Sequence, residues 1–286
     1  MDECPVCLEV GGEQRCSCGR AYHSSCIHGL LENDYDSCLM CYNRFSPAFY
    51  LVGAEFALRH DKRPMNLINF ATALTGTGQA HTALQTLCRV PRGKCPNLDA
   101  CVLIESARAL LQIGSPSLAI RRLRTALHIT KNKASAGLYV RALAFLCNAH
   151  QKQGDDKMCR SVAAVALAHT RKMHYTMAIF IMKTLKDSYH STGEKLRHKE
   201  VCETLCEIIK VEELRDKETV AEAEAELAIA EEALGIDSKT RLQSALCVLR
   251  KRKHTLTEPA ALCLAAQVKP AKRLRKKVHP EEVASK

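Results

Sequence analysis

The sequence predicts a mainly α-helical protein that begins with a small metal-binding segment. Three observations support this class. Eight cysteine and histidine residues gather in pairs within the first 41 residues, glycines recur further along at intervals of 36, 40 and 39 residues, and aromatic residues make up only 5% of the chain. A composition that is poor in aromatic residues and rich in alanine and leucine favours helices over sheets.

The N-terminal segment carries its metal-ligand side chains in four closely spaced pairs: Cys4/Cys7, Cys16/Cys18, His23/Cys26 and Cys38/Cys41. Structural zinc needs four thiolate or imidazole donors and no open position, so the eight side chains supply two tetrahedral Zn²⁺ sites with none left over. A segment this short buries too little apolar surface to fold alone, so metal binding would provide its folding free energy. Reduced structural cysteines that cluster without a metal are the alternative.

The residues between these ligands resemble the RING finger of ubiquitin ligases, in the opening CPVCLE, the segment CSCGRAYHSSCIHGLL and the closing CLMCYNRF. The resemblance covers about residues 1–47 and, with histidine as the fifth ligand, is to the RING-CH subclass. PHD fingers share this ligand order but usually carry a tryptophan where this chain has Asp36. The resemblance implies a cross-brace, in which one zinc is held by Cys4, Cys7, His23 and Cys26 and the other by Cys16, Cys18, Cys38 and Cys41.

In the RING family a shallow apolar surface docks a ubiquitin-conjugating enzyme, and the matching positions here are Val6, Leu30 and Leu39. Three exposed apolar side chains on a metal-stiffened frame would form a small binding patch. The alternative is that Val6 and Leu30 fill the small core between the zinc ions. The chain departs from the family pattern where Leu30 replaces a tryptophan, Leu39 a proline, and Tyr42 an arginine that often clamps ubiquitin.

Past residue 50 the chain repeats around Gly78, Gly114, Gly154 and Gly193, each of which lies in a short polar break between two helical patterns. The same apolar offsets return behind each glycine: Ala83, Leu87 and Val90; Ala119, Leu123 and Ala126; Cys159, Ala163 and Ala166; His198, Cys202 and Leu205. Offsets of three and four residues place these side chains on one face of a helix. A glycine between two such helices suits the turn of an antiparallel hairpin.

These offsets resemble the tetratricopeptide repeat (TPR), although the units exceed its nominal length of about 34 residues. A fifth unit is predicted to turn at Gly235, between segments 218–234 and 239–250. The resemblance implies an α-solenoid over residues 48–250 with a concave groove for a protein or peptide. A non-repeating helical bundle is the alternative, and it shares the all-α class. The cluster Arg121, Arg122 and Arg124 could line such a groove, but a run like this is more often a solvated helix face.

Positive charge is concentrated at the C-terminal end. Residues 250–286 hold eleven Lys and Arg against three Glu, a formal +8 of the whole chain's +11. Few apolar residues after Val268, with Pro270 and Pro280 interrupting the chain, predict disorder in the tail at 251–286. The basic cluster within 269–277 comprises Lys272, Arg273, Arg275, Lys276 and Lys277. It would act as a nuclear-import signal, as a nucleic-acid contact through phosphate, or as a solubilising tail.

Several function classes find no support in the sequence. It holds no nucleotide-binding glycine loop, nucleophile elbow or HExxH motif. No secretory signal is expected, because the start MDECPVC has neither a basic leader nor an apolar core, and no stretch reaches the roughly 18 apolar residues of a membrane span. The nine cysteines outside the ligand pairs show no metal spacing. Most of them lie among apolar helical residues and are expected to be buried free thiols. Together with the zinc ligands they indicate a reducing intracellular compartment, the nucleus or the cytoplasm or both.

These patterns predict an intracellular RING-type ubiquitin ligase with a finger at 1–47, a repeat domain at 48–250 and a basic tail at 251–286. The finger would bind the conjugating enzyme and the repeats would select a protein substrate. Transfer would proceed by proximity, with no catalytic side chain from this protein. A non-enzymatic zinc-finger and TPR-like adaptor or scaffold, associated with nucleic acid through its tail, is the competing interpretation.

Overall fold

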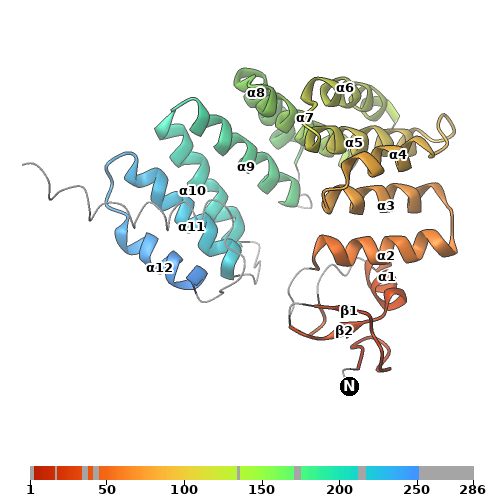
Figure 1. The fold of residues 1–286 in the computed structure, drawn as a ribbon. Helices are drawn as coiled ribbons and strands as arrows, with labels where there is room; N and C mark the ends of the chain where they lie inside the picture. Colours follow the sequence, from red (N-terminus) through yellow and green to blue (C-terminus); the bar gives the residue numbers. More distant parts are fainter. Residues whose placement is uncertain are drawn as a thin grey trace, which may run out of the picture. The chain divides into compact units, whose positions relative to one another are not determined.

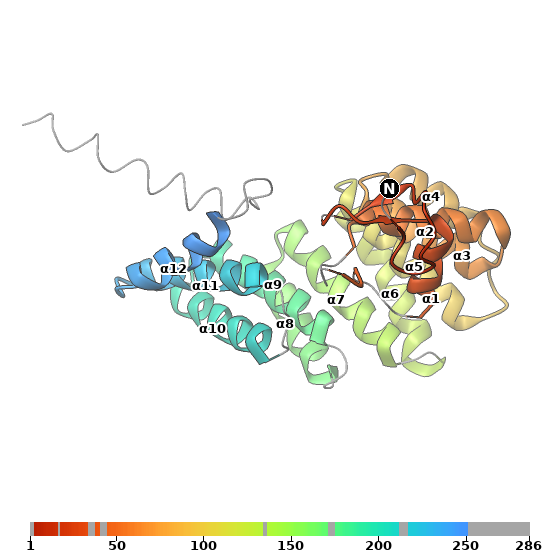
Figure 2. The same cartoon turned by 90° about the horizontal axis from the view of Figure 1, so that it is seen from below.

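The computed structural model describes residues 3–16, 18–33, 38–40, 45–133, 136–170, 175–211 and 217–250. Within these ranges the protein is mainly helical, with twelve helices and one two-stranded sheet (Figures 1 and 2). The chain divides into two compact units, Met1–Glu194 and Lys195–Lys286. None of the described helices is both long enough and apolar enough to cross a membrane. The predicted tail at 251–286 lies outside the described residues.

The first unit begins with a short hairpin and a helix. Strand β1 (Gln14–Arg15) pairs antiparallel with β2 (Ala21–Tyr22), and Gln14 lies opposite Tyr22. Helix α1 (Ser24–Glu32) follows directly. The carboxylate of Glu13 accepts hydrogen bonds from the backbone N–H and the hydroxyl of Ser24, both at 3.2 Å, and so satisfies part of the helix start. The hairpin and the cap together fix where α1 begins.

Helix α2 (Pro47–His60) packs directly on α1 (Figure 1). Gly53 permits the close approach, because a Cβ at that position would lie 3.0 Å from side-chain carbons of both Ile27 and Leu31 on α1. Phe45 and Phe49 stack on each other with ring centroids 4.9 Å apart. Both rings meet the buried Tyr22 edge to face, at 5.7 and 5.9 Å. The predicted limit of the finger at residue 47 therefore lies at the start of a helix that shares the core of the finger.

The repeats of the first unit follow as helical hairpins. Their helices are α3 (Pro64–Gly76) with α4 (Ala80–Cys88), α5 (Pro96–Gln112) with α6 (Pro116–Lys133), α7 (Ala136–Gln153) with α8 (Asp156–His169), and then α9 (Tyr175–Ser191). Helices α3, α5, α7 and α9 pack successively against one another, while α4, α6 and α8 pack on their hairpin partners. The predicted array of antiparallel hairpins is thus confirmed for this unit.

The second unit contains α10 (Lys195–Val211), α11 (Lys217–Glu232) and α12 (Lys239–Arg250). Helix α11 packs on both of the others. Small alanines make the contact between α11 and α12 close: Ala221, Ala225 and Ala228 are buried against Leu242, Ala245 and Leu246. The looser fifth unit predicted around Gly235 is present as the α11–α12 hairpin.

Glycine ends one helix in every repeat. Gly78, Gly114, Gly154, Gly193 and Gly235 have φ between +73° and +86°, a region that strains residues with a Cβ. The N–H of the next residue bonds to a carbonyl five residues back, as in a Schellman cap: Gln79 to Leu74, Ser115 to Leu110, Asp155 to His150, Glu194 to Tyr189 and Ile236 to Glu231. The recurrence of glycine in the sequence therefore follows from the backbone geometry of these turns.

The apolar offsets behind the glycines form the core of the array. Of the twelve residues predicted there, His198 is half-buried and the remainder are buried. Alanine or cysteine at the first position of the first three sets keeps paired helices close, since these side chains are short. Proline begins α2, α3, α5 and α6. Its fixed φ suits a helix, and the N–H that it lacks would have no partner within the helix at this position.

Candidate metal centre

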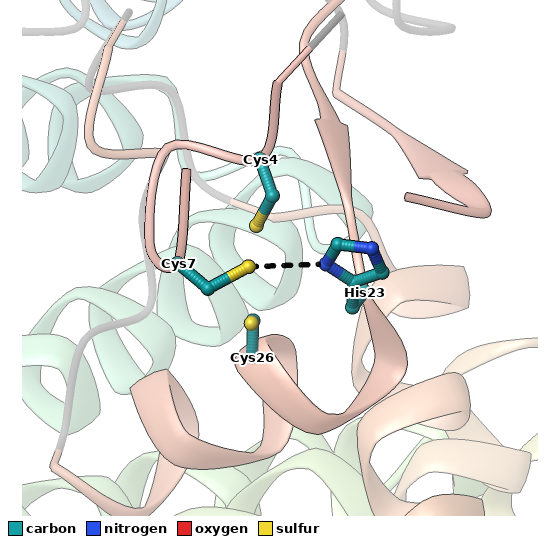
Figure 3. Close-up of side chains that lie close together, drawn as sticks. All are labelled: Cys4, Cys7, His23 and Cys26. Atoms are coloured by element: carbon teal, nitrogen blue, oxygen red, sulfur yellow. Dashed lines mark hydrogen bonds between the residues drawn. The ribbon is translucent and has the colours of Figure 1, made fainter. Parts of the chain in front are cut away.

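The side chains of Cys4, Cys7, His23 and Cys26 converge on one point (Figure 3). Their donor atoms all lie within 4.8 Å of one another, and Cys7 Sγ is 3.3 Å from His23 Nδ1. Sulfur donors around a tetrahedral zinc lie roughly 3.8 Å apart, given Zn–S bonds of about 2.3 Å. The group could therefore hold one metal ion with no large movement.

A second group forms from Cys16, Cys18 and Cys38, whose sulfurs also lie within 4.8 Å of one another. Cys18 Sγ is 3.8 Å from Cys38 Sγ. The Tyr22 hydroxyl lies 3.0 Å from Cys38 Sγ and accepts a hydrogen bond from the Leu39 N–H at 3.3 Å. Cys41, the predicted fourth ligand, lies outside the described residues.

The two groups interleave along the chain. The first ligand pair meets the third, while the second pair meets Cys38. The β1–β2 hairpin explains this arrangement, because it carries Cys16 and Cys18 at its turn and then returns the chain to His23. This is the cross-brace connectivity that the RING resemblance implied. The metal ligands predicted from the sequence are thus brought together, as far as they are described.

A tight turn follows each N-terminal cysteine pair. Leu8 has a φ of +64°, and its N–H bonds to the Cys4 carbonyl at 2.9 Å. Gly19 has a φ of +88°, and its N–H bonds to the Cys16 carbonyl at 2.8 Å. A residue in the left-handed region curls the backbone so that successive N–H groups can face an anion. At the first pair the backbone of Cys7, Val6 and His23 does form hydrogen bonds to Cys4.

The electrostatics of the first group match that geometry. Burial disfavours the Cys4 thiolate, but hydrogen bonds from the backbone of Cys7, Val6 and His23 outweigh it and lower the pKa of Cys4 to about 6. At Cys26, burial together with hydrogen bonds to the sulfurs of Cys7 and Cys4 raises the pKa to about 12. The negative charge of one thiolate thus disfavours ionisation of the neighbouring thiol. A cation among them would remove that opposition, so the donor set fits a metal ion.

The residues predicted to dock a conjugating enzyme differ in their exposure. Val6 is 42% exposed and Leu39 is half-buried, but Leu30 is only 8% exposed. Leu30 belongs to the core that also contains Phe45 and Phe49, so α2 removes it from the surface. For Leu30 the structure therefore supports the alternative left open by the sequence, a role in the small core.

Other apolar side chains on the finger are exposed and were missed in the sequence. Leu8 is 72% exposed, Val10 51% and Met40 53%. Leu8 and Met40 lie directly beside predicted metal ligands in the chain, and that adjacency is the signal that could have identified them. Together with Val6 they give the zinc loops their apolar surface.

The basic residues considered for the repeats lie apart from the metal centre. Arg121, Arg122 and Arg124 on α6 are all exposed. They therefore match the solvated helix face that the sequence favoured. Lys272, Arg273, Arg275, Lys276 and Lys277 lie outside the described residues.

Comparison with known proteins shows the fold. No protein-family model matches the chain, and no curated protein matches it significantly. BtubC (BKLC) from P. vanneervenii resembles it with a TM-score of 0.50 at 14% identity, over 84% of this chain and 96% of that one. The nearly identical TPR-like repeats of a Podosopora anserina protein assigned as a kinesin light chain resemble it with a TM-score of 0.54 at 19% identity, over 68% of this chain and 98% of that one. A point variant of the same Podosopora anserina protein gives a TM-score of 0.54 at 19% identity, over 68% of this chain and 99% of that one.

At these identities the likeness concerns the fold alone. It agrees with the helical hairpins, the turn glycines and the buried offsets described above. By its fold the chain is a TPR-like helical-repeat protein, and its N-terminal Cys and His groups could hold metal ions.

Proposed function

We propose that this protein is a RING-type ubiquitin-ligase scaffold. Its finger binds two zinc ions and docks a ubiquitin-conjugating enzyme, and its TPR-like array recruits the protein to be modified. The interleaving of the two donor groups carries the proposal, because it is the cross-brace connectivity of that family. The helical-repeat fold supports the recruiting role, since arrays of this kind present extended surfaces to protein ligands.

Zinc is the metal that fits the donor chemistry. Cys4, Cys7 and Cys26 with His23 offer three sulfurs and one imidazole, a closed set typical of structural zinc. Cys16, Cys18, Cys38 and the predicted Cys41 would complete the second site. Bound zinc supplies rigidity rather than reactivity here, because neither site keeps an open position.

The docking surface consists of the exposed apolar side chains of the zinc loops. Val6 and Leu8 belong to the first loop and Met40 to the second, with Leu39 half-buried beside it. Small apolar patches on a rigid frame are typical of protein-binding hot spots. The chain would then accelerate ubiquitin transfer by holding two partners together, and none of its side chains need act as a nucleophile.

A non-enzymatic adaptor is the second candidate, and one specific observation favours it. The helix position that carries a docking side chain in the RING family is occupied by Leu30, which is buried. Without it the apolar surface is confined to the loops. In this case the finger would serve as a zinc-stapled interaction module beside the repeats.

Self-ubiquitination of the full-length, zinc-loaded protein with a broad panel of conjugating enzymes distinguishes the two candidates. Val6→Arg should abolish transfer while the zinc content stays unchanged, because it places a charge in a desolvated contact. Val165→Arg on α8 is the matched control, since Val165 is 43% exposed and lies outside the finger. Should no enzyme in the panel support transfer by the unmodified protein, the ligase proposal fails and the adaptor remains.

A further inference from the structure

A cleft of about 780 Å³ opens within the first unit, between α1, α2 and α3, and reaches Arg108 on α5. Its volume is in the range of sites that bind small molecules or short peptide segments, about 300–1,000 Å³. Its walls come from the finger and from the first repeats, so neither part forms it alone. It is separate from the metal centre, because none of the seven predicted ligands that the structure describes lines it.

Small residues keep the cleft open. Ala54 and Ala57 of α2 and Ala73 and Gly76 of α3 are among its lining residues. A Cβ on Gly76 would meet Pro47 alone, at an ordinary van der Waals distance of 3.5 Å. A larger side chain at this position would therefore enter the cleft without a backbone clash. The rings of Phe45 and Tyr50 provide an apolar part of the lining.

The α3 wall of the cleft is polar but uncharged. Helix α3 contains no charged residue from Pro64 to Gly76. Asn69 is exposed, Thr72 is half-buried, and the Asn66 amide donates to the Asp61 carbonyl at 2.9 Å. Amide side chains offer both donors and acceptors, which is what an extended peptide backbone requires.

An excess of positive charge lies at the α5 end of the cleft. Glu105 is 1% exposed and is shared between Arg108, at 3.5 Å, and Arg141. One carboxylate between two guanidinium groups leaves one positive charge uncompensated, and Arg108 is the member of the trio that lines the cleft. Glu32 and His28 of α1 also line the cleft and lie 3.3 Å from each other. Arg63, which also lines the cleft, is paired with Asp61.

We infer that this cleft docks an extended segment of a partner protein that carries a carboxylate beside an apolar side chain. Arg108 receives the carboxylate, the α3 amides bond to the peptide backbone, and the apolar side chain lies against Tyr50. A carboxylate is favoured at the α5 end because Arg108 holds the uncompensated charge there and α3 adds no acid to repel it; Glu32, the acid among the described lining residues, belongs to α1. This inference rests on the recruiting role in the proposed function and names the chemistry of the recruited partner.

Selection from a display library of random unstructured peptides, on immobilised full-length zinc-loaded protein, tests the inference. The enriched peptides should share an acidic residue close to an apolar one. A selected peptide, labelled with fluorescein, is then titrated by anisotropy. Arg108→Gln should weaken its binding roughly tenfold or more, because a hydrogen bond to a charged group is lost. Arg121→Gln on the exposed face of α6 is the control and should leave affinity unchanged.

Gly76→Leu tests the cleft itself without altering charge. It should weaken peptide binding roughly tenfold or more by narrowing the cleft next to Pro47, and it should not unfold α3, since leucine has a higher helix propensity than glycine. Gly29→Leu is the matched control, because Gly29 is also helical, has open space at its Cβ position and does not line the cleft. Thermal unfolding of each variant verifies the fold.

The inference is overturned if no peptide is enriched, if the enriched peptides lack an acidic residue, or if Gly76→Leu binds the selected peptide as well as the unmodified protein does. The result is separable from the ligase proposal. Self-ubiquitination does not require the cleft, so Gly76→Leu should retain it. If instead no conjugating enzyme supports transfer, the peptide titration still reports on the cleft.

Discussion

Replacement of Arg141 by methionine should destabilise the first unit by leaving a buried carboxylate with a poorer partner. Glu105 on α5 is 1% exposed and forms an ion pair with Arg141 on α7, so the contact joins two successive repeats. Methionine keeps most of the volume of the arginine stem but removes its charge. Arg108 remains, at 3.5 Å from the other carboxylate oxygen. The perturbation therefore isolates the charge that links α5 to α7.

The size of the effect follows from burial. Breaking a buried ion pair by removing one partner costs about 3–5 kcal/mol, because the other charge stays desolvated. Arg141 is itself 33% exposed and Arg108 retains part of the contact, so a loss of about 2–3 kcal/mol is expected. Glu105→Met together with Arg141→Met should be more stable than Arg141→Met alone, since the double variant leaves no orphaned carboxylate.

Denaturant unfolding of the full-length zinc-loaded variants, followed by far-UV circular dichroism, measures these differences as shifts of the midpoint. The two single variants and the double variant complete a double-mutant cycle. A coupling energy below about 0.5 kcal/mol, or an Arg141→Met variant as stable as the unmodified protein, would refute the reasoning. Lys183→Met, at an exposed position on α9, controls for the loss of a positive charge alone.

Three further predictions concern metal, pH and the tail. Metal analysis of protein purified without chelator should return about two Zn²⁺ per chain. Removal of the metal by a chelator should speed amide exchange in α2 more than in α5, because Phe49 of α2 is buried in the core of the finger. Equal protection of both helices after chelation would contradict this prediction. Burial lowers the pKa of His150, an effect that Asp155 opposes and Arg124 adds to. The folded state therefore binds a proton at His150 less readily than the unfolded chain does. The contribution of neutral His150 to the free energy of unfolding should be fully present above about pH 6.5 and should be lost as the pH falls below it. His150→Phe should flatten that decline in pH-dependent melts, and an unchanged slope would count against it. Deletion of residues 269–277 should move the protein from nucleus to cytoplasm without altering its zinc content, if this segment is an import signal. If the deletion instead abolishes salt-dependent binding to nucleic acid, the segment contacts phosphate.

The sequence by itself determined the features that depend on neighbouring residues. The turn glycines could be found because a left-handed helix end requires a residue without a Cβ, and that requirement is local. The buried offsets behind them could be found because helical periodicity places residues three and four apart on one face. The metal ligands could be found because their pairs are separated by only one or two residues. Each of these signals is contained within one short stretch of chain.

Only the tertiary structure decided which side chains share a surface across distant segments. Leu30 lies in the core because Phe45 and the α2 residue Phe49 pack in the same cluster. The residues around Leu30 in the sequence do not predict this contact. Glu105 is tolerated in the core because Arg141 reaches it from the next repeat. The cleft exists because small residues on both α2 and α3 line it together with side chains of α1. Packing between elements sets exposure and charge pairing, and packing depends on shape and contacts that spacing along the chain does not encode.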